Sequence, residues 1–105
     1  MATYIMLIKL SDEAAANLHD AKSGRDAGKK VARAVGVEWK ASYLLVGAEY
    51  DVLVVLKAPD EHAIAKFALL GNLSGAVSTR IVRALTENET DDLISSIADL
   101  SELVA

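Results

Sequence analysis

The feature that most constrains the fold is a run of aliphatic residues in the middle of the chain. Val52–Leu56 is an unbroken aliphatic series, which Lys57 closes and which Tyr50 and Asp51 precede. An apolar run of this length, bounded by polar residues, is typical of a strand that is buried on both faces. The sequence therefore predicts a central strand with a polar pair at its entrance.

The segments on either side predict further strands. Thr3–Leu10 is again apolar on both faces, whereas Val37–Val46 begins with apolar and polar residues in alternation, which predicts one wet face. In this alternation Trp39 and Tyr43 fall on the same side. Val77–Leu85 predicts a fourth strand.

Capping residues mark the starts of the helices. Ser11 precedes the first helical region, and Asp60 precedes the second. Both side chains can accept hydrogen bonds from the free amides of a first helical turn. Thr86 and Glu89 have the spacing of a capping box, which predicts a last helix at about residues 89–104.

The first helical region is expected to be uneven. Gly24 and Gly28 each cost about 1 kcal/mol relative to alanine inside a helix. We therefore expect a loose or broken segment over residues 19–24 and a firm helix over residues 25–35. Gly36 then stands where a left-handed C-terminal cap is needed.

The predicted order of elements is β-α-β-β-α-β-α, and an internal similarity supports it. Leu7–Glu13 aligns with Val55–Glu61, and in both segments a strand ends in lysine before Asp-Glu opens a helix. Two β-α-β halves form the ferredoxin-like fold, in which both main helices cover one face of an antiparallel sheet. Residues 1–105 are thus expected to form one α+β domain, with its core in residues 3–85 and an added C-terminal helix.

This fold leaves one face of the sheet without a cover. The first and third strands are apolar on both faces, yet the two main helices cover only one of them. The C-terminal helix could cover part of the other face, but the sheet of a second subunit is the simpler cover. We therefore expect a homodimer or a higher homo-oligomer of the dimeric α+β barrel type.

Composition and charge narrow the choice of partners. No cysteine is present among the 105 residues, which excludes thiolate chemistry and fits a reducing cytoplasm. A formal net charge of −4 argues against nucleic acid, and neither a signal peptide nor a membrane span is expected. Basic residues gather at 22–33 and acidic residues at 87–102. This pattern predicts either two solvated helix faces or docking of the acidic segment on the basic helix of the same chain or of a partner.

Four motifs follow one another along the chain: the opening residues 1–12, Lys40–Tyr43, Gly47 with Tyr50-Asp51, and Val54–Asp60. In this order and spacing they resemble the GYD-domain proteins, small bacterial proteins named for the glycine, tyrosine and aspartate of the turn. The resemblance covers roughly residues 2–90. It implies a ferredoxin-like fold related to dimeric α+β barrels, and it implies no activity, because the function of that family is unknown.

One position departs from the pattern of that family. There a single residue separates the glycine from the tyrosine, whereas Ala48 and Glu49 both stand between Gly47 and Tyr50 in this chain. The extra residue predicts a bulge in the turn.

Candidates for binding a small molecule, either between the sheet and the helices or inside a barrel, are Tyr50, Asp51, Tyr43, Trp39, His19 and Arg80. Tyr50 and Asp51 have the chemistry of general acid–base catalysis, but aspartate at such a place more commonly holds turn amides. His19 could reach a ligand, a haem iron or a proton, although an exposed loop histidine is the commoner case. For Trp39 and Tyr43, packing is the commoner role.

No catalytic, nucleotide-binding or metal-binding motif is present, so the sequence predicts neither a cofactor nor a metal site. Three functions stay open. A non-catalytic homo-oligomeric module that binds or senses a small ligand is favoured. The first alternative is a small, cofactor-light enzyme of the monooxygenase or isomerase type, with a pocket near the hairpin Gly47–Asp51. The second is an accessory protein that docks on a larger partner.

Overall fold

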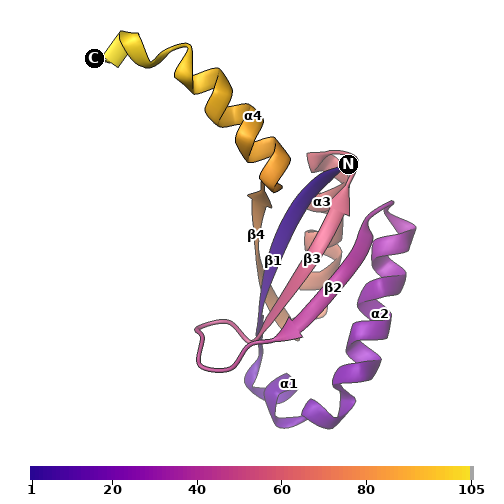
Figure 1. Ribbon diagram of the computed structural model, residues 1–105. Coiled ribbons are helices and arrows are strands. Elements are labelled where there is room, and N and C mark those ends of the chain that lie inside the picture. Colours follow the sequence, from indigo (N-terminus) through magenta and orange to yellow (C-terminus); the bar gives the residue numbers. More distant parts are fainter. Residues whose placement is uncertain (105) are drawn as a thin grey trace.

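The computed structural model describes residues 1–104 and contains one four-stranded sheet with helices on one of its faces (Figure 1). The elements are β1 (Ala2–Leu10), α1 (Asp12–Ala16), η1 (Leu18–Asp20), α2 (Ala21–Ala34), β2 (Glu38–Leu44), β3 (Val52–Ala58), α3 (Glu61–Asn72), β4 (Val77–Ala84), α4 (Glu87–Ala98) and η2 (Ser101–Val104).

The strands lie in the order β2-β3-β1-β4, and every neighbouring pair is antiparallel. The two strands that are apolar on both faces, β1 and β3, occupy the centre of the sheet. The two strands with more polar residues, β2 and β4, form its edges, where polar side chains can reach water. The predicted ferredoxin-like α+β fold with an added C-terminal helix is confirmed.

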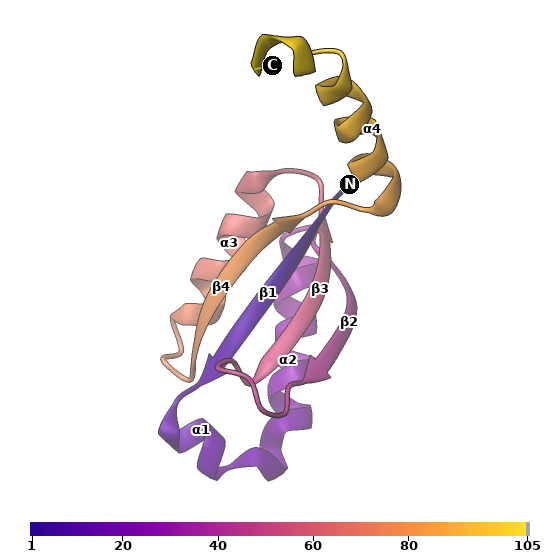
Figure 2. The same ribbon diagram turned by 60° about the vertical axis from the view of Figure 1, so that its left-hand side comes forward.

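The core lies between one face of the sheet and the helices α2 and α3, which cover it (Figures 1 and 2). Val54 and Leu56 of β3 are fully buried at its centre. The buried residues of this core are Tyr4, Met6, Ala32, Val37, Val54, Leu56, Ala58, Ala63, Ile64 and Phe67.

The helices begin where the capping residues predicted. The side-chain oxygens of Ser11 and Asp60 accept hydrogen bonds from the amides three residues later, at 3.1 and 2.8 Å. Thr86 and Glu89 form the reciprocal hydrogen bonds of a capping box. These bonds satisfy amides that would otherwise lack partners at the helix starts.

The first helical region differs from the prediction. The break falls around Asn17, whose amide donates to the carbonyl of Ala14, and α2 already begins at Ala21. Gly24 lies inside α2 and does not interrupt it. The cost of one glycine is small, so it is outweighed when the rest of the helix, including the fully covered Ala32, packs on the sheet.

Replacing Gly24 or Gly28 by alanine should change the free energy of unfolding by different amounts. A Cβ at Gly24 would meet no atom within 4 Å, so Gly24→Ala should raise the free energy of unfolding by about 0.5–1 kcal/mol. A Cβ at Gly28 would lie 3.1 Å from Cζ3 of Trp39, so the indole must move and the gain is offset. Urea unfolding of both variants measures the difference, and equal stabilisation would contradict the close approach of the indole to α2.

The capping box also fixes the point at which α4 leaves β4. Glu89 accepts hydrogen bonds from the amide of Thr86 at 3.0 Å and from Nη2 of Arg83 at 2.8 Å. The guanidinium of Arg83 in turn lies 5.7 Å from the ring centre of Tyr4 in β1. The hydrogen bond from Thr86, followed by that from Arg83, lowers the pKa of Glu89 from its ordinary value of 4.5 to about 2.

This shift predicts how the start of α4 responds to acid. Because the folded pKa is depressed, the stabilisation by Glu89 is complete above about pH 4.5 and is lost as the pH falls through about 2. We expect α4 to lose helix content over this range. Circular dichroism of Glu89→Gln should show a smaller loss than the parent protein, whereas Glu87→Gln in the same turn serves as the matched control. An identical acid response in all three proteins would contradict the role of Glu89.

Beyond the end of β4, α4 extends away from the sheet and from α2 (Figures 1 and 2). Docking of the acidic segment on the basic helix of the same chain, one of the two interpretations of the charge pattern, is therefore wrong for the described residues. Within residues 1–104, no helix is both long enough and apolar enough for a membrane crossing.

Candidate functional site

The face of the sheet opposite α2 and α3 is apolar at its centre. Met6 and Val54 point toward the helices, so their neighbours Leu7 and Leu53 point to the other side. The strand registers place two rows of side chains across all four strands on this open face. The first row is Tyr43, Leu53, Leu7 and Arg80, and the second is Ala41, Val55, Ile5 and Val82.

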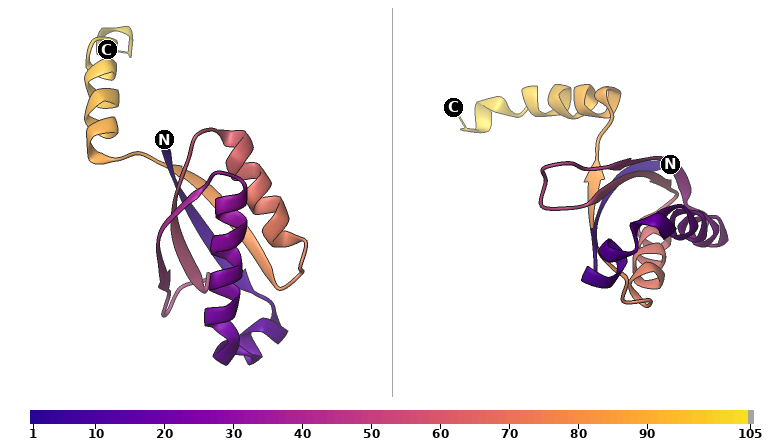
Figure 3. Two further views of the ribbon diagram at one scale, coloured as in Figure 1. Left: turned by 90° about the vertical axis from the view of Figure 1, so that its right-hand side faces the viewer. Right: turned by 90° about the horizontal axis from the view of Figure 1, so that it is seen from below.

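No helix of residues 1–104 covers this open face, and only the hairpin loop of residues 45–51 projects on this side, at the end near Lys9 (Figures 2 and 3). Tyr43 is 58% exposed and Val82 is 46% exposed, while Leu53 and Val55 are half-buried by their neighbours in the sheet. Contiguous apolar surface of this kind marks an interaction site more often than a surface left to water. The open face is therefore the main candidate site.

Charged side chains border the two apolar rows. Lys57 lies beside the second row and pairs in register with Glu38 and Thr3. Lys9, opposite Ser78, lies beyond the first row and donates from Nζ to the carbonyl of Glu49 at 3.0 Å. The open face thus combines an apolar centre with a charged border, on which Lys57 and Lys9 are basic and Glu38 is acidic.

The prediction that Trp39 and Tyr43 share a face is wrong. The register of β2 against β3 shifts between Trp39 and Ala41, so Lys40 adds one residue to β2. Trp39 consequently points toward the helices, where its ring meets that of Phe67 edge-on with centres 6.5 Å apart. Tyr43 pairs with Leu53 and points to the open face.

Asp51 serves the backbone at the entrance of β3. Its amide donates to the carbonyl of Ile8 at 2.8 Å, and its carbonyl accepts from the amide of Leu45 at 2.8 Å. Its carboxylate accepts from the amide of Leu10, also at 2.8 Å. Asp51 therefore ties the hairpin loop to the end of β1 and extends the pairing of β1 with β3 beyond Val52.

Substitutions of Asp51 should therefore lower the stability of the protein to different extents. Asp51→Ala leaves the amide of Leu10 without its partner and should lower the free energy of unfolding by about 1–3 kcal/mol. Asp51→Asn should cost less, because its side-chain carbonyl can still accept this hydrogen bond. Chemical denaturation of both variants measures the order, and a reversed order would contradict the structural role.

The predicted bulge in the turn is also wrong. Residues 45–51 form an open loop, in which Gly47 has a φ of +83°. The extra residue relative to the family pattern is accommodated by this loop, and the shift in strand register lies in β2 instead. The positive φ of Gly47 explains why a glycine is used there.

The six predicted site residues fall into separate parts of the molecule. Tyr43 and Arg80 stand at opposite ends of the first row of the open face. Tyr50 and Asp51 lie in the hairpin loop, and Trp39 lies on the covered face. His19 lies in η1, where its side chain is 74% exposed and its Nε2 is 3.6 Å from Oδ2 of Asp20.

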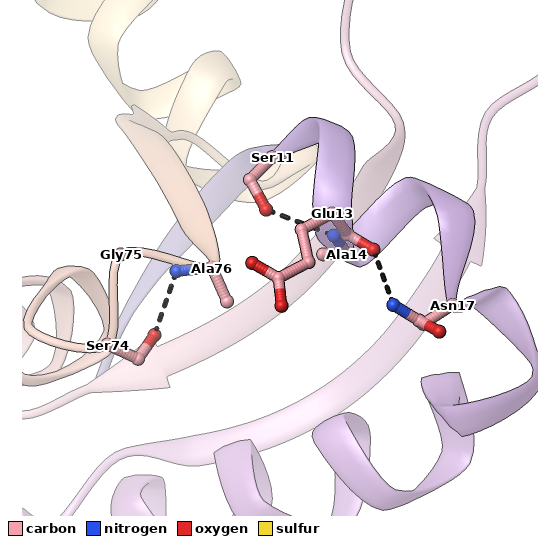
Figure 4. A pocket seen from close by; sticks show the side chains of 7 residues that line it. All are labelled: Ser11, Glu13, Ala14, Asn17, Ser74, Gly75 and Ala76. Atoms are coloured by element: carbon pink, nitrogen blue, oxygen red, sulfur yellow. Dashed lines mark hydrogen bonds between the residues drawn. The ribbon is translucent and has the colours of Figure 1, made fainter.

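Two shallow depressions lie beside each other at the end of β1, and neither contains any of the six candidates. The first, of about 300 Å³, lies between α1 and the loop that precedes β4 (Figure 4). Its polar groups bind their own backbone: Ser11 accepts from Ala14, Ser74 accepts from Ala76, and Asn17 donates to Glu13. The carboxylate of Glu13 also lines this depression, so its polar lining consists of one carboxylate and of groups already engaged with the local backbone.

Reasoning from reactive side chains misses the apolar residues of the open face, because these residues carry no reactive or ligating group. The signal that could have found them is the apolar pattern on both faces of β1 and β3, which predicted the open face itself. Among residues 1–104, no three His, Cys, Asp or Glu side chains lie close enough together to bind a metal ion.

The fold and the open face together define a class: a small ferredoxin-like α+β protein whose sheet is covered on one side only. The model of the GYD domain family matches residues 4–94, so the chain belongs to the GYD domain family. No curated protein matches the chain. Membership of this family, whose function is unknown, leaves the function to be inferred from the open face.

Proposed function

We propose that the protein is a homo-oligomeric module, in its simplest form a homodimer, in which a second copy covers the open face and the two copies enclose a small ligand. The two rows across all four strands, which are apolar except for Arg80 and the hydroxyl of Tyr43, support this proposal most directly. Two sheets that pack face to face lie about 10 Å apart with interdigitating side chains. On this face Ala41 is small and Tyr43 is large, although both lie on the same edge strand. The side chains of two such faces would therefore leave part of the space between the sheets free for a ligand.

The chemistry of the open face indicates the class of ligand. Its centre is aliphatic, and Tyr43 and Arg80 provide a hydroxyl and a guanidinium at the two ends of one row. Such a lining fits a small, mainly apolar molecule with one anionic group. The role proposed is binding or sensing without catalysis, because the carboxylate of Asp51 beside Tyr50 is held by the amide of Leu10, and His19 lies apart from both in η1.

An enzyme with its pocket at the hairpin receives less support from the structure. The carboxylate of Asp51 is engaged by the amide of Leu10, so it already has a structural role. A cytoplasmic location in a bacterium belongs to the same proposal, and the absence of cysteine and the family resemblance support it.

Ligand binding is tested with anilinonaphthalene sulfonate, an apolar dye with one anionic group. We expect saturable dye binding to the parent protein and a dissociation constant at least about tenfold higher for Arg80→Gln, since a charge-assisted contact is lost. Lys66→Gln on the exposed side of α3 is the matched control and should bind the dye like the parent. Equal binding by all three proteins would contradict an anion-binding role of Arg80. Native mass spectrometry of the purified protein would then identify any ligand retained from the cell.

A further inference from the structure

The last helix carries an apolar stripe that no part of residues 1–104 covers. Leu93, Ile94 and Ile97 are 48–58% exposed, and helical spacing places them on one side of α4. Acidic residues border this stripe on both sides, with Asp91 on one and Asp92 on the other. An amphipathic helix of this kind is stable when its apolar side packs against another surface.

The position of α4 relative to the sheet indicates where that surface lies. In both panels of Figure 3, α4 is displaced to the side of the sheet opposite α2 and α3. It therefore lies at the level that a second copy would occupy when it covers the open face. The helices α2 and α3 of its own chain lie on the other side of the sheet, so α4 does not pack against them.

Charge selects the part of the second copy that α4 can contact. Residues 87–104 contain six acidic residues and no basic one, so two α4 helices side by side would repel each other. The helix α2 is the strongest basic surface of the chain. Its basic residues are Lys22, Arg25, Lys29, Lys30 and Arg33.

The sheet itself favours an arrangement in which these two helices meet. When two open faces pack about a two-fold axis parallel to the strands, β4 of one copy lies against β2 of the other. Arg80 then approaches Tyr43 of the second copy. An axis perpendicular to the strands would instead bring β4 against β4, and where it runs along the first row it would bring Arg80 toward its own equivalent, which is unfavourable.

When the two-fold axis is parallel to the strands, α4 lies next to the β2 edge of the second copy's sheet. It follows β4, and α2 lies beside β2 (Figure 1). The C-terminal end of α2, with Lys30 and Arg33 exposed on it, is at the same end of the sheet as the start of α4 (Figure 1).

We infer that α4 is an exchanged arm, whose apolar stripe and acidic borders pack against the exposed side of α2 in a second copy of this chain. The inference rests on the proposed function in one respect, namely that a second copy covers the open face. The acidic residues meet Lys30 and Arg33, and the stripe covers the exposed alanines and aliphatic stems of α2.

A charge exchange between two variants tests the arm. One variant carries Lys30→Glu and Arg33→Glu, and the other carries Asp91→Lys and Asp92→Lys. Each homodimer then has two repulsive arm contacts, whereas the mixed dimer has two attractive ones. We expect dissociation constants at least tenfold higher for each variant alone, and native mass spectrometry of the mixture should show heterodimers well above the statistical half.

Lys22→Glu with Lys66→Glu is the matched control, because it makes the same charge change away from the contact. Mixed with the Asp91→Lys, Asp92→Lys variant, it should show no comparable preference. A statistical distribution in the first mixture, or an equal preference in the control mixture, would overturn the exchanged arm.

Because the chain has no cysteine, single cysteines provide a second, independent readout. Copies with Asp91→Cys and copies with Lys30→Cys should form a disulfide-linked heterodimer on mild oxidation. Faster linkage of Asp91→Cys copies to each other would indicate paired α4 helices and overturn the inference. If the parent protein is dimeric but the mixed charge variants form no excess of heterodimers, the exchanged arm alone is refuted. If the parent protein is monomeric, the proposed function is refuted as well.

Discussion

Val55→Asp is expected to convert the proposed homo-oligomer into folded monomers. Val55 lies at the centre of the second row, between Ala41 of β2 and Ile5 of β1. A carboxylate there would be buried against the apolar face of the second copy without a partner, which costs several kcal/mol. If the free energy of association becomes less favourable by about 4 kcal/mol, the dissociation constant rises by roughly a thousandfold.

The fold of this variant should persist, because the side chain of Val55 points away from the core. Light scattering measures the mass, and circular dichroism checks that the helices and strands remain. Ala65→Asp, on the exposed side of α3, introduces the same charge away from the open face and should leave the mass unchanged. Val55→Asp monomers that are unfolded, or a Val55→Asp oligomer of unchanged mass, would both conflict with the assigned face.

Leu56→Ala is expected to destabilise the chain strongly at any protein concentration. Its side chain is fully buried between the sheet and the helices, and removal of such a leucine leaves a cavity. The free energy of unfolding should fall by about 2–5 kcal/mol.

Leu53→Ala, three residues earlier in β3, should behave differently. Leu53 lies in the first row of the open face, so its truncation should weaken the proposed association of two copies. Its effect on apparent stability should grow with protein concentration and nearly vanish on dilution, because a dimer is stabilised by mass action. Urea unfolding of both variants across a range of concentrations makes the comparison. The same concentration dependence for both would mean that the two faces of β3 are not used differently.

Most of the fold could be predicted from the sequence because local and long-range signals agree. The aliphatic run at Val52–Leu56 is a central strand, and Ser11, Asp60 and Thr86 cap the helices as their side chains predict. Sequence reasoning misplaces the break in the first helical region, because the cost of Gly24 is small compared with the packing of α2 on the sheet. Helix propensity alone does not contain that packing.

The candidate site was harder to predict for a physical reason. Residues 37–43 alternate regularly, so nothing local announces the register shift at Lys40 that turns Trp39 to the core and Tyr43 to the open face. The shift follows from tertiary contacts of Trp39 with Phe67 and Gly28. The direction in which α4 leaves the sheet likewise depends on Arg83 and its contacts.

The central claim is that a second copy covers the open face, and the mass of the parent protein in solution tests it most directly. Multi-angle light scattering at micromolar concentration measures this mass without any label or substitution. The account predicts a mass twice that of one chain, or a higher multiple. A mass equal to that of a single chain, unchanged as the concentration is raised, would contradict it.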